Sequence, residues 1–156
     1  MQGDREVIEA LNDVLTAELT AINQYFVHAK MRRNWGYLRL AKKAHEESIA
    51  EMKDADELIE RILYLEGVPN LQRLYTVRVG ESPVEQLELE RDTERAAVER
   101  LNRAIALART KADEGTSQLL VDILHGEEKS LDWLETQLHL VSQLGAERYL
   151  AEQLHD

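Results

Sequence analysis

The stretch GVPNLQRLYTVRVGES, at residues 67–82, decides the predicted fold because it joins two long helical segments and has no helical pattern of its own. Its 16 residues span roughly 50 Å when fully extended. The segment before it, residues 37–65, predicts a helix about 42 Å long. The connection can therefore run the whole length of a helical bundle. A structureless link of this length is otherwise uncommon in a compact domain.

Clusters of glycine, proline and asparagine divide the rest of the chain into helical segments. The clearest start follows the connection: Ser82 is a predicted N-cap, Pro83 takes the first helical position, and Glu85 completes a Ser-x-x-Glu capping box. The predicted helices cover residues 4–34, 37–65, 83–112, 116–143 and a short 146–154.

The lengths of the links predict the topology. Short links make the first and second helices antiparallel, and the third and fourth likewise, so the long link makes the second and third helices parallel. The predicted fold class is therefore all-α. We expect a ferritin-like four-helix bundle with a long crossover between the second and third helices and a short fifth C-terminal helix, in a single domain over residues 1–156.

Composition limits the kind of partner. Thirty acidic residues against 19 basic ones give a formal net charge of −11, which disfavours nucleic acid and favours cations. The absence of cysteine fits a reducing cytoplasm and excludes both a thiolate zinc site and a disulfide framework. The start of the chain is unlike a signal peptide, and no apolar run approaches the ~18 residues of a membrane span. We expect a cytoplasmic protein without nucleic-acid or membrane partners.

An acidic residue interrupts the apolar stripe of each long helix near its middle. These residues are Glu18, Glu51, Glu94 and Glu127, with Asp54 one turn beyond Glu51. A single acid at the edge of a stripe normally reaches water or pairs with an arginine. Four acids at one height would meet in the core, where carboxylates are costly unless paired, protonated or bound to metal. The pattern therefore predicts a metal-binding cluster.

Four segments resemble bacterioferritin, the haem-containing branch of the ferritins, and they lie in the first, second and fourth predicted helices and at the start of the connection. They are LTAINQYF (19–26), HEESIAEMKDA (45–55), IERILYLEGVPN (59–70) and DWLE (132–135). The resemblance implies a 24-subunit shell that stores ferric mineral, with a di-iron ferroxidase site inside each bundle.

The resemblance also assigns the ligand positions. The family pattern has one Glu on each of the first and third helices and Glu-x-x-His on each of the second and fourth. The four central glutamates of this chain match that pattern, but Asp54 and Ser130 occupy both histidine positions. Where some relatives carry a His and Asp pair facing the shell cavity, this chain has Glu46 and Ala50.

No other histidine is expected to replace the missing ligands. His125 lies two residues before Glu127 and points about 200° round the helix, and His28 is nearly three turns from Glu18. We expect His45, His139 and His155 at surfaces or interfaces. Tyr25, on the same stripe as Glu18, is a candidate for redox chemistry.

A cluster made only of oxygen ligands favours hard cations. We therefore expect this chain by itself to be a weak or inactive ferroxidase, whose site could still hold ferric iron, Ca²⁺, Mg²⁺ or Zn²⁺.

Met52 points about 100° away from Glu51, and so away from the predicted metal cluster. By itself, a methionine on an apolar stripe is most often a core filler. The resemblance instead implies that Met52 is an axial ligand of haem b, with the methionine of a twofold-related subunit on the other side. The expected haem pocket comprises Leu19, Ile22, Asn23, Phe26, Ile49 and Ile59.

Three functional hypotheses follow. In the first, the chain is a haem-bearing shell subunit with a degenerate ferroxidase centre that co-assembles with a second, ferroxidase-competent bacterioferritin subunit and receives electrons from a ferredoxin-type reductant. In the second, it forms a homomeric shell with residual ferroxidase activity at an all-oxygen metal site. In the third, it is a plain shell subunit that binds neither haem nor catalytic metal.

Overall fold

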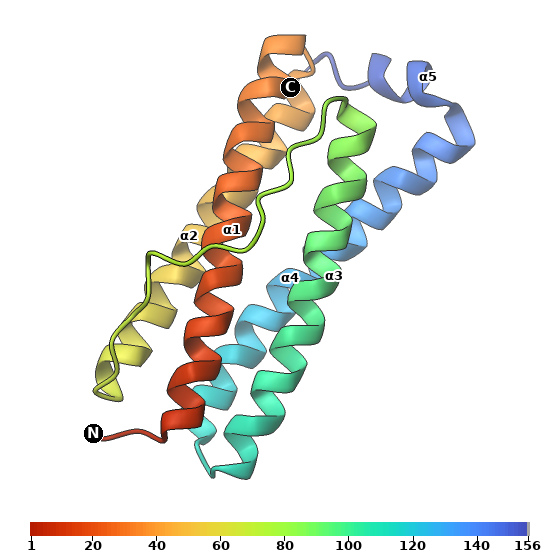
Figure 1. Ribbon diagram of the computed structural model, residues 1–156. Coiled ribbons are helices and arrows are strands. Elements are labelled where there is room, and N and C mark those ends of the chain that lie inside the picture. The colour runs from red at the N-terminus through yellow and green to blue at the C-terminus, as the bar shows by residue number, and fades with distance from the viewer. Residues whose placement is uncertain (156) are drawn as a thin grey trace.

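The computed structural model describes residues 1–155, which contain five helices (Figure 1). The helices are α1 (Arg5–Trp35), α2 (Leu38–Tyr64), α3 (Pro83–Thr110), α4 (Glu114–Leu144) and α5 (Ala146–Ala151). The first four form an elongated bundle, and α5 lies across one end of it. The predicted all-α ferritin-like fold is confirmed, and each helix bound lies within three residues of the predicted one.

Local sequence signals set the ends of these helices. The Asp4 carboxylate caps α1 by accepting from the backbone N–H groups of Glu6 and Val7. At the other end of α1, Gly36 adopts a left-handed conformation with φ of 92°, which glycine tolerates without a Cβ clash. The predicted N-cap of α3 is present, since the Ser82 hydroxyl accepts from the Glu85 N–H at 3.2 Å.

The reciprocal half of the predicted capping box differs from expectation. The Glu85 carboxylate accepts from the backbone N–H of Glu81 at 3.3 Å, one residue before the N-cap. Glu85 therefore ties the end of the connection to the first turn of α3.

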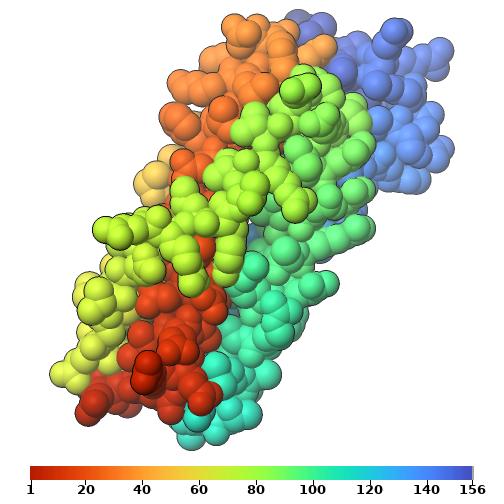
Figure 2. Space-filling model, viewed as in Figure 1, coloured from red at the N-terminus to blue at the C-terminus, as the bar shows by residue number. Residues whose placement is uncertain are grey.

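The connection between α2 and α3 runs along the outside of the bundle over α1, so α2 and α3 point in the same direction (Figure 1). Side chains of α1 hold the extended backbone of the connection. Gln24 donates to the carbonyl of Arg78 at 2.9 Å, and the Thr20 hydroxyl accepts from the N–H of Tyr75 at 2.9 Å. These bonds satisfy backbone groups that have no ladder or helix partners. In Figure 2 the connection crosses the face formed by α1 and α3 and leaves much of both helices visible.

The interior consists of apolar layers on both sides of a polar middle. One large cluster includes Leu11, Leu15, Leu58, Leu101 and Leu120, and it fills the half of the bundle near the start of α1. A smaller cluster at the opposite end joins Leu40, Leu87, Leu134 and Tyr149. Along α1 the fully buried apolar positions stop at Leu15 and resume at Ala21, with the buried Glu18 between them. The acidic residues therefore lie in a layer that both apolar clusters shield.

Within residues 1–155, no helix has the length and apolar character that crossing a membrane requires.

Candidate metal centre

Each of the four long helices contributes one glutamate to the centre of the bundle. Glu94 is 0% exposed, and Glu18, Glu51 and Glu127 are each 2% exposed. Each glutamate interrupts the apolar stripe of its own helix, so helix packing carries all four inward. The structure therefore brings together the four acids that the sequence singled out.

The carboxylates form two overlapping groups whose oxygen atoms lie within 4.8 Å of one another. The first group consists of Glu18, Glu51, Asp54 and Glu127, and the second of Glu47, Glu51 and Glu94. Glu51 belongs to both groups. The two groups share one carboxylate, and each has the oxygen spacing of a candidate cation site.

Burial dominates the electrostatics of this centre. It raises the pKa of Glu18, Glu51 and Glu127 well above the ordinary range, and neighbouring carboxylates raise it further. Burial also raises the pKa of Glu94 to about 7 and that of the half-buried Asp54 to about 6. A cation reverses this cost because it favours the ionised forms.

Several carboxylate oxygens in the centre have no hydrogen-bond donor. The buried Oε2 atoms of Glu18, Glu51 and Glu94 all lack a partner. Buried polar atoms are normally satisfied, so each such oxygen needs an explanation. Protons shared between the carboxyls provide one, and oxygen-coordinated cations provide the other.

Tyr25 is a direct neighbour of the cluster. Its hydroxyl donates to Glu94 Oε1 at 2.7 Å, and both side chains are buried. Burial and the nearby carboxylates raise the pKa of Tyr25 well above its usual value, so the phenol keeps its proton and orients Glu94. Tyr25 lies on the same stripe as Glu18, as predicted, but the acid that it contacts is Glu94 of α3.

The two expected histidine positions have different environments. Asp54 lies in the first carboxylate group. The Ser130 hydroxyl instead donates to Glu47 Oε2 at 2.8 Å, and Lys43 Nζ lies 3.1 Å from Glu47 Oε1. Glu47 was not predicted as a site residue. The sequence feature that could have identified it is its position one turn before Glu51, on the same face of the helix.

The remaining histidines lie away from the centre. His45, His125, His139 and His155 are exposed. His28 is fully buried in a separate polar network, where its Nδ1 lies 2.6 Å from Glu90 Oε2. Because the backbone N–H of Gly80 donates to His28 Nε2 at 3.0 Å, the ring proton is on Nδ1 and donates to Glu90.

Arg32 completes the network around His28. Its Nη2 donates to both oxygens of Glu90 at 2.9 Å, and its Nε donates to Gln86 at 2.9 Å. The network joins α1, α3 and the end of the connection. This network was not predicted from the sequence, because a charged residue near a helix end is ordinarily exposed.

A cavity of about 310 Å³ leads from the face covered by the connection to the carboxylates. Glu18, Glu51, Glu94 and Glu127 line its inner part. Tyr75 and Arg78 of the connection and Arg100 of α3 line its outer part. The guanidinium of Arg100 lies 4.7 Å from the centre of the Tyr75 ring. The cavity therefore borders both the central carboxylates and side chains of the connection.

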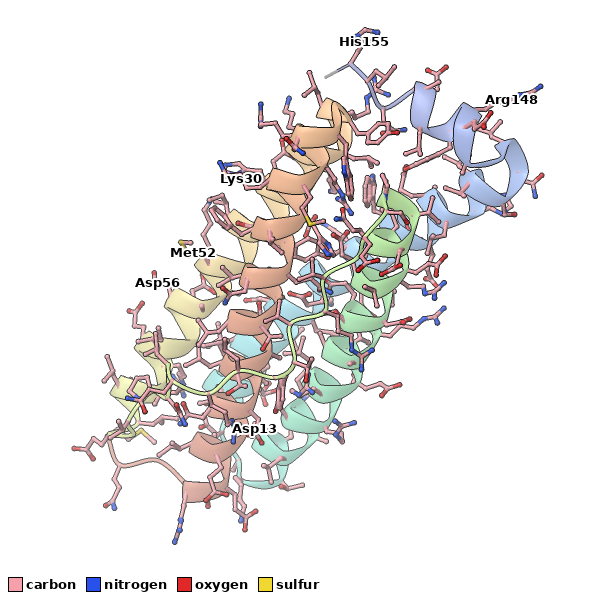
Figure 3. All side chains as sticks on the ribbon, turned by 45° about the horizontal axis from the view of Figure 1, so that its top comes forward. Asp13, Lys30, Met52, Asp56, Arg148 and His155 are labelled. Carbon is pink, nitrogen blue, oxygen red and sulfur yellow. The ribbon has the colours of Figure 1, made fainter. Side chains whose placement is uncertain are left out.

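Met52 lies on a different surface of α2. It is 52% exposed, and Figure 3 shows its side chain pointing out of the bundle. Phe26 is also 52% exposed and Ile49 is 39% exposed. Asn23 is exposed, while Leu19, Ile22 and Ile59 are half-buried. Of the expected haem-pocket residues, Phe26 and Ile49 are therefore exposed apolar side chains like Met52, whereas Leu19, Ile22 and Ile59 also pack against the larger core cluster.

The four-helix bundle, its long crossover and its central carboxylates define the class of protein. Residues 8–144 match the family model described as the ferritin-like domain. Three curated relatives show which branch of that class applies. The bacterioferritin of Mycolicibacterium paratuberculosis is 49% identical over 97% of this chain and 96% of its own length. The bacterioferritin of Streptomyces coelicolor is 50% identical, covering 97% of this chain and 90% of the relative.

The bacterioferritin of Brucella melitensis is 44% identical over 96% of this chain and 92% of its own length. Identity at this level over nearly complete chains establishes homology. The chain therefore belongs to the bacterioferritin family, and the family resemblance found in its sequence is confirmed.

Proposed function

We propose that this iron-storage subunit binds haem through Met52 and has a degenerate ferroxidase centre, so that it co-assembles with a second subunit that oxidises iron. One observation carries the proposal: Met52 and the central carboxylates lie on different faces of α2. Glu51 and Asp54 face an interior cluster without histidine, whereas Met52 is exposed on an apolar surface.

The surface around Met52 suits haem b. A porphyrin needs an apolar contact area, which the exposed Phe26 and Ile49 side chains supply, and an accessible axial ligand. One methionine from each of two twofold-related subunits gives a bis-thioether ligand set, which favours ferrous haem and raises its reduction potential. Electrons from a ferredoxin-type reductant could then reach stored ferric iron and release it.

The centre inside the bundle suits slow iron chemistry. Ferrous iron is the substrate of a ferroxidase, and imidazole ligands normally complement carboxylates at such positions. This centre offers only oxygen ligands, and four or more carboxylates carry a high negative charge. We infer that ferric iron and other hard cations bind well there and that oxidation by dioxygen is slow.

The proposed setting is a cytoplasmic 24-subunit shell. In this arrangement the present chain supplies haem, and a partner chain with both histidines supplies rapid iron oxidation. Purification of the assembly from its native cell followed by mass spectrometry should find the second chain. A shell built only from this subunit would contradict the division of labour.

The haem part of the proposal is tested by substitution of Met52. We expect Met52→Leu to abolish the Soret band of the purified shell, and Met52→His to retain it with a shifted spectrum and a lower potential. Met31→Leu is the matched control, because Met31 lies on α1 beside Gln86. Haem binding that survives Met52→Leu unchanged would exclude Met52 as the ligand.

The alternative is a homomeric shell with residual ferroxidase activity at the all-oxygen site. The cavity between the connection and α3 favours it, because this cavity reaches the carboxylates directly. Stopped-flow oxidation of the homomeric protein separates the two functions. Rapid uptake of about two Fe(II) per subunit supports the alternative, and slow oxidation supports the division of labour.

A further inference from the structure

Ser130 occupies the position on α4 where the family pattern has a histidine, and the carboxylate of Glu47 lies next to it. Ser130 is too short to reach a metal in the manner of an imidazole, but its hydroxyl donates to Glu47 Oε2 at 2.8 Å. The Glu47 side chain is 13% exposed. A carboxylate from α2 therefore lies beside Ser130, where the family pattern has a histidine.

Two further carboxylates complete this position. Oxygens of Glu47, Glu51 and Glu94 all lie within 4.8 Å of one another. Two oxygen ligands on opposite sides of a cation are about 4.2 Å apart for Mg²⁺ and about 4.8 Å or slightly more for Ca²⁺. The three carboxylates are therefore spaced closely enough to coordinate one divalent cation.

Unsatisfied oxygens point independently to a ligand. Glu51 Oε2 and Glu94 Oε2 have no hydrogen-bond partner, although their side chains are 2% and 0% exposed. The other oxygen of Glu94 accepts from the Tyr25 hydroxyl at 2.7 Å, which fixes the carboxylate. Tyr25 and Ser130 thus orient two of the three carboxylates in the way that outer-shell groups orient metal ligands.

Lys43 forms an ion pair with Glu47. Its Nζ lies 3.1 Å from Glu47 Oε1 and 4.9 Å from the centre of the Trp133 ring. The aromatic face gives the ammonium group a second partner when Glu47 turns toward a cation. Lys43 is therefore expected to compete with metal binding at this position and to leave the other position unaffected.

We propose that Glu47 replaces the missing histidine of α4, so that Glu47, Glu51 and Glu94 form a second cation position selective for hard divalent cations such as Mn²⁺. The first position consists of Glu18, Glu51, Asp54 and Glu127. Oxygen-only ligand sets suit Mg²⁺, Ca²⁺ and Mn²⁺ more than metals that prefer nitrogen. The proposal rests on the carboxylate cluster described above as the degenerate centre, and it is independent of haem.

The test is titration of the metal-stripped full-length shell with Mn²⁺, followed by calorimetry and by the EPR signal of free Mn²⁺. We expect about two Mn²⁺ per subunit for the native chain. Glu47→Gln should keep the bond from Ser130 but weaken the second binding event about tenfold or more. Lys43→Met should strengthen that event several-fold, because it removes the cation that pairs with Glu47.

Glu46→Gln is the matched control, because it removes the same charge from an exposed neighbour on α2. Identical titrations for Glu47→Gln and Glu46→Gln would overturn the proposal, and so would a native chain that binds only one Mn²⁺. Either result would leave the haem function of Met52 intact, since the Soret band measures that function separately. A native chain that binds no Mn²⁺ would overturn both the proposal and the hypothesis that the carboxylate cluster binds metal.

Discussion

Two short side chains determine how this centre differs from a di-iron site. Asp54 remains within reach of the cluster and adds an oxygen ligand. Ser130 does not join the cluster, and its hydroxyl instead holds Glu47. The first position therefore has a carboxylate within the cluster, and the second has a serine whose hydroxyl holds a neighbouring carboxylate.

Restoring both histidines should restore rapid chemistry. We expect the double variant Asp54→His, Ser130→His to oxidise about two Fe(II) per subunit in a fast phase that the native homomeric protein lacks, because imidazole stabilises both iron oxidation states. Stopped-flow absorbance measures this phase. The double variant Asp54→Asn, Ser130→Ala is the control for loss of the original side chains. If the histidine variant is no faster than this control, the missing imidazoles do not limit oxidation.

At the scale of elements, the connection between α2 and α3 is held by polar groups that the bundle supplies. Gly80, near its end, donates to His28 of α1, while Glu90 of α3 pairs with both His28 and Arg32. An alanine at position 80 would bring its Cβ within 2.7 Å of Gln86 backbone nitrogen. The crossover is therefore fixed by specific buried contacts and by close backbone packing.

Removing the charge of Glu90 should destabilise the fold. Arg32 and Glu90 are 0% and 1% exposed, so Glu90→Gln leaves a buried guanidinium without its counter-charge. The expected loss is about 3–5 kcal/mol in the free energy of unfolding. Urea denaturation followed by circular dichroism measures it. Glu88→Gln, on the exposed side of α3, should change stability by less than about 0.5 kcal/mol. Equal stability of the two variants would contradict a structural role for the buried pair.

At the scale of the whole molecule, the central carboxylates oppose the folding of the metal-free chain at neutral pH. Burial raises the pKa of Glu94 from 4.5 to about 7, and that of Asp54 from 3.8 to about 6. The folded state therefore binds more protons than the unfolded state between these values. Stability consequently falls as the pH rises through this window, which is opposite to the behaviour of a salt-bridged carboxylate.

This pH dependence can be measured directly. We expect the Tm of the metal-free shell to fall between pH 4.5 and about 7 through the titration of the central carboxylates. We also expect Mn²⁺ to raise Tm more at pH 7.5 than at pH 5.5. Glu94→Gln should make the Tm less dependent on pH. Glu99→Gln, which is exposed on the same helix, is the control and should behave like the native chain. Equal pH dependence in all three proteins would refute this assignment.

The sequence by itself determined the elements of this protein and the four glutamates of its centre, because these depend on local signals. Helical periodicity, the Ser82 cap and the length of the 67–82 connection are properties of neighbouring residues, and an acid in an apolar stripe is visible along one helix. The separation of Met52 from Glu51 also follows from the angle between adjacent helical positions.

Only the tertiary structure decided which groups of different helices meet. The contact of Ser130 with Glu47 joins residues 83 positions apart, and that of Arg32 with Glu90 joins residues 58 apart. A charged residue is expensive to bury unless a partner reaches it, and the pattern along one helix does not show that partner. The folded bundle brings Arg32 and Glu90 together and excludes water from both charges.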